Sequence, residues 1–146
     1  MLPQVLTGLG WVLRDLGQPN DARARLERAV SIYETSGAAS PGFARAHTGL
    51  GLVLRDLGLL GDARAALERA LEVSAEAGGS NEMADILDVF GRVTRTQGDL
   101  NTARMYLERA LSIREADNGP ADPRVGLTLT FLGRVLGDLG ELDLAQ

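Results

Sequence analysis

Apolar residues recur at intervals of three and four along this chain, which is the spacing of one buried face of an amphipathic helix. A clear example lies between residues 60 and 77, where small and apolar residues form one stripe: Ala63, Leu67, Ala70, Leu71 and Ser74. Glycine and proline interrupt the pattern at regular points and separate the stripes. The pattern therefore predicts a chain of helices joined by short turns.

The same pattern is repeated along the whole chain. Its clearest markers lie 41, 40 and 42 residues apart: Gly10, Gly51, Gly91 and Gly133. A second set of glycines follows at the same intervals: Gly17, Gly58, Gly98 and Gly140. A fixed period of this size indicates stacked units of supersecondary structure. We expect the second set to end the first helix of each unit, because glycine readily adopts the left-handed backbone of a tight turn.

Each repeat is predicted to hold two antiparallel helices, A and B. Helix A of the second repeat is expected from Pro41 to Leu57, and its helix B from Leu60 to Ala77. The repeats form a single array of seven helices, at about residues 2–40, 41–79, 80–121 and 122–146, the last being incomplete.

The turns between the helices carry signals of their own. Three short polar residues stand directly before a helical stripe and are the expected N-caps: Ser40, Asp99 and Asp122. Gly78 and Gly79 are expected to close the second repeat. After Gly140, the segment from Glu141 is expected to turn back and begin a further helix B, of which only the first turn is present.

Glycine within helix A needs a physical reason, because it costs about 1 kcal/mol relative to alanine in a helix. An alanine of helix B recurs at the same intervals as this glycine: Ala22, Ala63, Ala103 and Ala145. We expect the glycine and the alanine to face each other, so that the two helices approach closely. The cost then recurs because the close packing recurs.

Composition narrows the classes of function. With 45% hydrophobic residues the chain can form a core, and its net charge of −5 argues against direct binding to nucleic acid or to an anionic membrane. All 15 basic residues are arginine, and there is no cysteine. Lysine Schiff-base chemistry, thiolate chemistry and disulfides are therefore excluded. The lack of cysteine fits a cytoplasmic protein, and no stretch of sequence is apolar enough for a transmembrane helix.

No catalytic constellation stands out. Gly8-Leu9-Gly10 begins like a dinucleotide-binding fingerprint, but the third glycine and a preceding strand are missing. His47 is the only histidine, and a single histidine without cysteine makes no ordinary zinc site. We therefore predict no enzyme activity, no metal and no cofactor. His47 is interpreted as a packing residue with one ring nitrogen hydrogen-bonded locally, in preference to a pH switch.

The order of Leu-Gly and a second Gly on helix A, then Ala and Leu on helix B, resembles the tetratricopeptide repeat (TPR). The resemblance covers essentially the whole chain and implies an all-α, right-handed solenoid of antiparallel helix pairs, with about three and a half repeats. The period of 40–42 residues is similar to the longer repeats of kinesin light chains and of arrays on bacterial regulators. The usual large residue early in helix A is replaced here by Leu6, His47, Leu87 and Leu129.

In TPR arrays helix A lines the inner groove. The resemblance therefore implies a partner-binding groove formed by Thr7, Trp11, Arg14, Arg45, Thr48, Leu52, Arg55, Asp88, Arg92, Arg95, Thr130 and Arg134. The N-terminal half of this set offers an apolar anchor, and the C-terminal half gathers arginines, whose forked side chains suit carboxylates. An alternative is that Arg14, Arg55 and Arg95 only pair with Asp15 and Asp56 of neighbouring repeats.

We therefore expect a protein-interaction scaffold that binds an extended or helical peptide in the groove, one that is acidic and carries an apolar anchor. Nucleic acid and membranes are not expected partners. The alternative is a self-association or regulatory module of a larger bacterial signalling ATPase or transcriptional regulator, with copies associating through the array ends. Because the repeat pattern begins and stops inside a unit, we expect the chain to be a segment of a larger protein.

Overall fold

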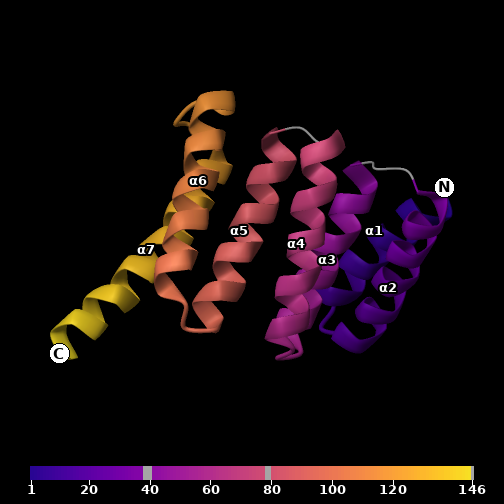
Figure 1. Ribbon diagram of the computed structural model, residues 1–146, viewed down its shortest axis with the longest axis horizontal. Coiled ribbons are helices and arrows are strands. Elements are labelled where there is room, and N and C mark those ends of the chain that lie inside the picture. The colour runs from indigo at the N-terminus through magenta and orange to yellow at the C-terminus, as the bar shows by residue number, and fades with distance from the viewer. Residues whose placement is uncertain (38–40, 78–79, 146) are drawn as a thin grey trace.

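The computed structural model describes residues 1–37, 41–77 and 80–145, and every regular element in these ranges is an α-helix (Figure 1). The helices are α1 (Leu2–Asp15), α2 (Pro19–Ser36), α3 (Pro41–Asp56), α4 (Leu60–Ala77), α5 (Ser80–Thr96), α6 (Leu100–Asn118) and α7 (Pro123–Ala145). In the same ranges no helix combines the length and apolar character needed to cross a membrane.

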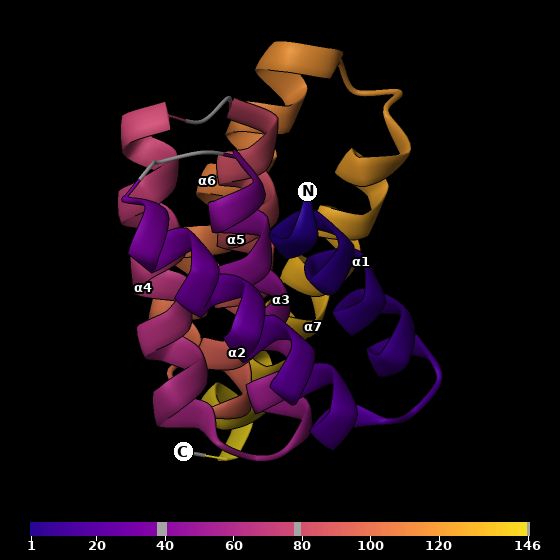
Figure 2. The same cartoon turned by 90° about the vertical axis from the view of Figure 1, so that its right-hand side faces the viewer.

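The helices stack as antiparallel pairs, α1 with α2, α3 with α4 and α5 with α6, and α7 packs on α6 (Figure 1). Along the stack each A helix (α1, α3, α5, α7) contacts the next A helix. Figure 2 looks along the stack with the first pair nearest the viewer and the later pairs behind it. The predicted all-α array of helix pairs is confirmed, and the predicted ends of the second repeat agree with α3 and α4 to within one residue.

Three glycines form the turns from helix A to helix B, as predicted. Gly17, Gly58 and Gly98 have φ angles of 75°, 79° and 82°, in the left-handed region where a Cβ is unfavourable. The fourth member of the set behaves differently. Gly140 does not adopt a positive φ and lies inside α7, so the prediction of a turn there is wrong. Instead α7 continues past Gly140 to Ala145.

The predicted N-caps have different outcomes. Asp122 caps α7, since its Oδ1 accepts a hydrogen bond from the backbone N–H of Arg124 at 2.8 Å. Asp99 is the N-cap residue of α6, as predicted, and its carbonyl oxygen accepts a hydrogen bond from the N–H of Ala103 at 3.0 Å. Its side chain makes no capping bond, and its Oδ2 lies 3.6 Å from a guanidinium nitrogen of Arg64 instead. Ser40, Gly78 and Gly79 lie outside the described residues.

The glycine within helix A makes room for a leucine of helix B. A Cβ added to Gly51 would lie 2.8 Å from Cγ of Leu67, and the equivalent distances are 2.5 Å for Gly10 and Leu26 and 2.5 Å for Gly91 and Leu107. The glycine was expected to face the alanine of helix B, and this expectation is wrong, because its nearest neighbour is the leucine. The alanine is nevertheless fully buried in the three complete repeats. Close packing of the helix pair is the reason for the glycine, and leucine is the side chain that requires it.

His47 is a buried packing residue. Its ring lies 4.9 Å from the ring of Phe43, and only 6% of the residue is exposed. Neither ring nitrogen has a hydrogen-bond partner among the described residues, so the predicted local bond is wrong. Burial, only partly opposed by the charge of Glu34, lowers the pKa of His47 to about 4. The imidazole is therefore neutral near pH 7.

Candidate functional site: the concave groove

An open groove of about 780 Å³ lies along the A helices. Helices α1, α3, α5, α6 and α7 contribute its lining residues: Trp11, Gly42, Arg45, Thr48, Leu52, Asn81, Glu82, Asp85, Asp88, Val89, Arg92, Arg114, Leu127 and Phe131. A second pocket of about 40 Å³ adjoins it through Arg92 and Phe131. The two share a mixed lining of aromatic, aliphatic and charged side chains.

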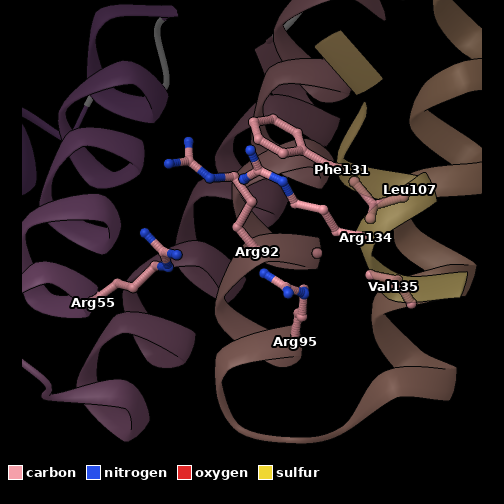
Figure 3. A pocket seen from close by; sticks show the side chains of 8 residues that line it. Arg55, Arg92, Arg95, Leu107, Phe131, Arg134 and Val135 are labelled. Carbon is pink, nitrogen blue, oxygen red and sulfur yellow. The ribbon is translucent and has the colours of Figure 1, made fainter. Parts of the chain in front are cut away.

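The structure brings together part of the predicted groove set. Six of the predicted residues line the large groove: Trp11, Arg45, Thr48, Leu52, Asp88 and Arg92. The small pocket adds Arg55, Arg95 and Arg134, whose guanidinium groups turn toward the same space as that of Arg92 (Figure 3). The remaining three predicted residues, Thr7, Arg14 and Thr130, line neither space.

One arginine row links neighbouring repeats. Each member donates from Nε to a side chain about one repeat further on, in the pairs Arg14–Asp56 (2.7 Å), Arg55–Thr96 (3.2 Å) and Arg95–Asp138 (2.7 Å). Arg14 and Arg95 thus make the inter-repeat ion pairs that were the alternative to ligand binding, and Arg55 makes the equivalent bond to a threonine. These side chains link neighbouring A helices, and their charges are partly engaged.

The hydroxyl groups of the predicted threonines are already hydrogen-bonded within their own helices. Thr7 donates to the carbonyl oxygen of Pro3 at 2.7 Å, and Thr48 donates to that of Ala44 at 2.8 Å. Thr130 in α7 makes the same type of bond, to Gly126. A threonine hydroxyl bonded to the carbonyl four residues earlier keeps only acceptor capacity for a ligand.

Arg92 is a partly buried cation of the groove that lacks a counter-ion. Among the described residues, no carboxylate lies within 4.0 Å of its guanidinium, which instead sits 4.8 Å from the ring centre of Phe131. Burial, helped by the positive charges of Arg55 and Arg14, lowers the pKa of Arg92 to about 10. Arg92 remains charged near neutral pH, and Arg134 across the small pocket adds further positive charge (Figure 3). An incoming carboxylate would relieve this unfavourable concentration of positive charge.

Trp11 lies against α3 at the other side of the groove. A Cβ added to Gly49 would lie 2.9 Å from Nε1 of Trp11, so the absence of a side chain at Gly49 creates the space for the indole. Nε1 itself is buried and has no hydrogen-bond partner among the described residues. The sequence predicted Trp11 as an anchor but not the role of Gly49, because the contact joins different repeats.

A buried polar cluster at the third repeat was not predicted. Arg114 of α6 is only 2% exposed and donates from one nitrogen to Asp85 and Asp88, at 2.7 Å each. Its Nε donates to the hydroxyl of Thr128 at 3.2 Å, and that hydroxyl donates in turn to Asp88 at 2.9 Å. The cluster joins α5, α6 and α7, and it forms part of the wall of the groove.

A signal for this cluster is nevertheless present in the sequence. Arg114 occupies the helix B position that holds Tyr33 and Ser74 in the first two repeats. Asp88 replaces a threonine of the other repeats, and Thr128 stands where they have valine, alanine or isoleucine. Three polar departures from one repeat pattern, at positions that face each other in the stacked units, could have identified the cluster.

Two carboxyl groups in this region have raised pKa values. Burial raises the pKa of Asp88, although the hydrogen bonds from Arg114 and Thr128 oppose that effect. Burial also raises the pKa of Glu82, and the negative charge of Asp85 adds to it. Oε2 of Glu82 is buried without a hydrogen-bond partner among the described residues. Glu82 therefore lacks the compensation that Asp88 receives.

Family models settle the relationship of this chain to known proteins. One model of the tetratricopeptide repeat matches residues 42–116 and again 82–146, and another matches residues 4–36. The chain belongs to the tetratricopeptide repeat family. The TPR fold is of the protein-interaction scaffold type, and this array is a scaffold of that general kind. Comparison with curated protein sequences gives no match.

Solved structures share the fold over nearly the whole chain. BtubC (BKLC) from P. vanneervenii is 25% identical, with a TM-score of 0.82 over 97% of this chain and 59% of its own. A Rap protein complexed with Competence and Sporulation Factor is 19% identical, with a TM-score of 0.87 over 98% of this chain and 39% of its own. A putative kinesin light chain from P. anserina with TPR-like repeats is 19% identical, with a TM-score of 0.83 over 98% of this chain and 71% of its own. The TPR array thus spans 59% and 39% of the lengths of BtubC and the Rap protein.

Proposed function

We propose that this TPR array binds a segment of a partner protein in the concave groove. An apolar side chain of the segment packs among Trp11, Leu52 and Phe131, and an acidic side chain binds Arg92 and Arg134. The observation that carries this proposal is the uncompensated, partly buried charge of Arg92 beside an apolar lining. Charge-assisted bonds from an arginine fork to a carboxylate are strong in such a half-buried place.

The comparisons support the proposal in general terms. The Rap protein of similar fold is complexed with a factor, which makes a bound partner a reasonable expectation for this array. The acidic character of the partner rests on the charges of this chain alone. A cytoplasmic location and a regulatory role in a larger bacterial protein remain predictions.

A peptide-display selection tests the proposal without knowledge of the partner. Random peptides are selected on the array, and binding of the enriched peptides is followed by the fluorescence of Trp11, the only tryptophan. Enriched peptides should contain an acidic and an apolar residue and should change the emission of Trp11. Arg92→Gln should weaken binding by about tenfold or more, equivalent to ~1.4 kcal/mol.

The matched control is Arg109→Gln, which removes an exposed arginine of α6 that lines neither the groove nor the small pocket. This control should bind like the unchanged protein. If no peptide is enriched, or if Arg92→Gln and Arg109→Gln bind equally well, the groove proposal is wrong.

Self-association is a second candidate, and one surface favours it. α1 and its C-cap residue expose an apolar stripe with exposed fractions between 40% and 65%: Leu2, Val5, Leu9, Val12 and Leu16. The equivalent faces of α3 and α5 are buried, as Val53 and Val93 show with no exposed area. Light scattering coupled to size-exclusion chromatography should detect a dimer that Val5→Arg with Val12→Arg disrupts. A monomer at all concentrations would exclude this candidate.

A further inference from the structure

The inner face of α5 is electrically divided along its length. Its first half presents carboxylates, from Glu82, Asp85 and Asp88, and its second half presents guanidinium groups, from Arg92 and Arg95. This acidic set is found on α5 and not on the other A helices. The equivalent positions of α1, α3 and α7 carry no acidic residue. The groove therefore has an acidic end and a basic end.

The helix dipole alone does not account for this division. It would favour acidic residues at the start of every A helix, yet the first turns of α1, α3 and α7 contain none. A ligand that carries both charges is the alternative explanation, and it requires that the acidic end be short of positive charge.

The acidic end is short of positive charge. Three carboxylates lie there. Among the described residues, only the guanidinium of Arg114 lies within 4.0 Å of this set, and it contacts Asp85 and Asp88. Glu82 has no ion pair within that distance in the described part of the chain, and its Oε2 is buried without a donor. Arg45 of α3 also lines the groove, but it is exposed and makes no such contact. A positively charged side chain would supply the missing donor.

The buried arginine of the same wall also has an unused group. Arg114 is 2% exposed, and its second terminal nitrogen, NH1, has no hydrogen-bond partner among the described residues. Arg114 lines the groove, as does Glu82. The wall thus offers one unpaired acceptor, on Glu82, and one unpaired donor, on Arg114. A peptide chain supplies both counterparts, with a donor for the carboxylate and a main-chain carbonyl for the guanidinium.

We infer that the groove binds its partner segment in one direction, with a basic side chain at Glu82 and Asp85 and an acidic side chain at Arg92. This inference rests on the proposed function and adds the charge order of the ligand. The apolar side chain of the segment lies between the two charges, where Val89 and Phe131 line the groove. A main-chain carbonyl near the basic residue accepts a hydrogen bond from Arg114.

The spacing of the two charges follows from helix geometry. Glu82 and Arg92 are ten residues apart on α5, which corresponds to about 15 Å at a rise of ~1.5 Å per residue. An extended segment covers that distance in roughly four to five residues at ~3.3 Å each. The ligand motif is therefore a basic residue, a central apolar residue and an acidic residue, with the charges about four or five positions apart.

The test compares peptide selections on the unchanged array and on Glu82→Gln. The unchanged array should enrich peptides with the basic and acidic residues at that spacing and in a single order. Glu82→Gln keeps the shape of the side chain but removes its charge, so its selection should retain the acidic residue and lose the basic one. A peptide selected on the unchanged array should bind Glu82→Gln about tenfold more weakly, and exchange of its two charged residues should weaken binding to the unchanged array by about as much.

The matched control is Glu108→Gln, which removes a carboxylate that pairs with Arg104 away from the groove and should not alter binding. Circular dichroism confirms that each variant is folded. If the enriched peptides are only acidic, bind equally in either charge order, or bind Glu82→Gln unchanged, this inference is wrong and the proposed groove function stands. If no selected peptide changes the emission of Trp11, both are wrong.

Discussion

The contact between the two helices of a repeat hardly changes along this chain, whereas one row of the concave face changes in each complete repeat. Between helices, glycine of helix A meets leucine of helix B in all three complete repeats, at hypothetical Cβ distances of 2.5–2.8 Å. On the concave face, one row holds a different residue in successive repeats, namely Trp11, Leu52 and Arg92, and Arg134 stands at the equivalent position of α7.

This difference follows from what each position touches. The glycine and leucine are fixed by close packing, which tolerates little change in volume. The concave positions face an open groove, so their side chains can vary without disturbing the stack. The variation of this row fits the proposed role of the groove. In the third repeat Arg114 and Asp88 also bring charged groups into the buried part.

The largest expected effect comes from a change in the buried cluster, where charged side chains lie between packed helices. Arg114→Met keeps much of the side-chain volume but leaves the carboxylate of Asp88 buried without its cation. We expect the free energy of unfolding to fall by about 3–5 kcal/mol, measured by urea denaturation. Adding Asp88→Leu removes the unpaired carboxylate and should restore most of the loss. If Arg114→Met alone is as stable as the unchanged protein, the cluster is not effectively buried.

His47 should make the stability of the first two repeats depend on pH. Its pKa is lowered on folding from 6.5 to about 4, so the unfolded chain binds the proton more readily. Stability is therefore fully present above about pH 6.5 and decreases as the pH falls toward 4, by roughly 3 kcal/mol in total. His47→Leu, which introduces the residue found at Leu6 and Leu87, should remove this part of the pH dependence. Identical pH profiles for the two proteins would contradict the burial of a neutral imidazole.

The glycine–leucine contact itself can be tested at Gly91. Gly91→Ala would place a Cβ about 2.5 Å from Cγ of the fully buried Leu107, so we expect a loss of about 1–3 kcal/mol in the free energy of unfolding. Gly126→Ala in α7 is the matched control, since no atom lies within 4 Å of its added Cβ. That change should instead stabilise the protein by about 0.5–1 kcal/mol through helix propensity. If both substitutions stabilise the protein, the helix pair is packed less closely than described.

The smallest effect is expected for the arginine row that links the repeats. The ion pair between Arg95 and Asp138 is short, at 2.7 Å, but about a third of each side chain is exposed. Arg95→Gln should therefore reduce the free energy of unfolding by less than about 1 kcal/mol in urea denaturation. A loss above roughly 2 kcal/mol would show that these bonds, and not the apolar packing of the A helices, hold the repeats in register.

Much of the fold was predictable because repeat period and helix periodicity are local properties of the sequence. The turn at Gly58 follows from glycine at the end of a helical stripe, but Gly140 carries the same signal and lies inside α7 without a positive φ. The partner of Gly51 was misjudged, since one face of helix B presents both Ala63 and Leu67 and only packing decides between them.

The candidate site was predictable only in part. The repeat pattern predicted that Trp11, Leu52 and Arg92 share one face, and all three line the groove. It did not distinguish Arg92, which lacks a counter-ion, from Arg95 one turn later, whose partner Asp138 is 43 residues away. Arg114 was missed for the same reason, because its partner Asp88 is 26 residues away in the sequence and adjacent only in the folded stack.

The most direct test of groove binding is the indole N–H signal of Trp11 in a two-dimensional ¹H–¹⁵N spectrum. During titration with a selected peptide this single signal should shift and saturate. The dissociation constant should rise about tenfold in Arg92→Gln. It should change by less than about twofold in Arg109→Gln, which removes an exposed arginine of α6 outside the groove lining. A peptide that binds without moving the Trp11 signal, or one that the two variants bind equally well, would contradict the account.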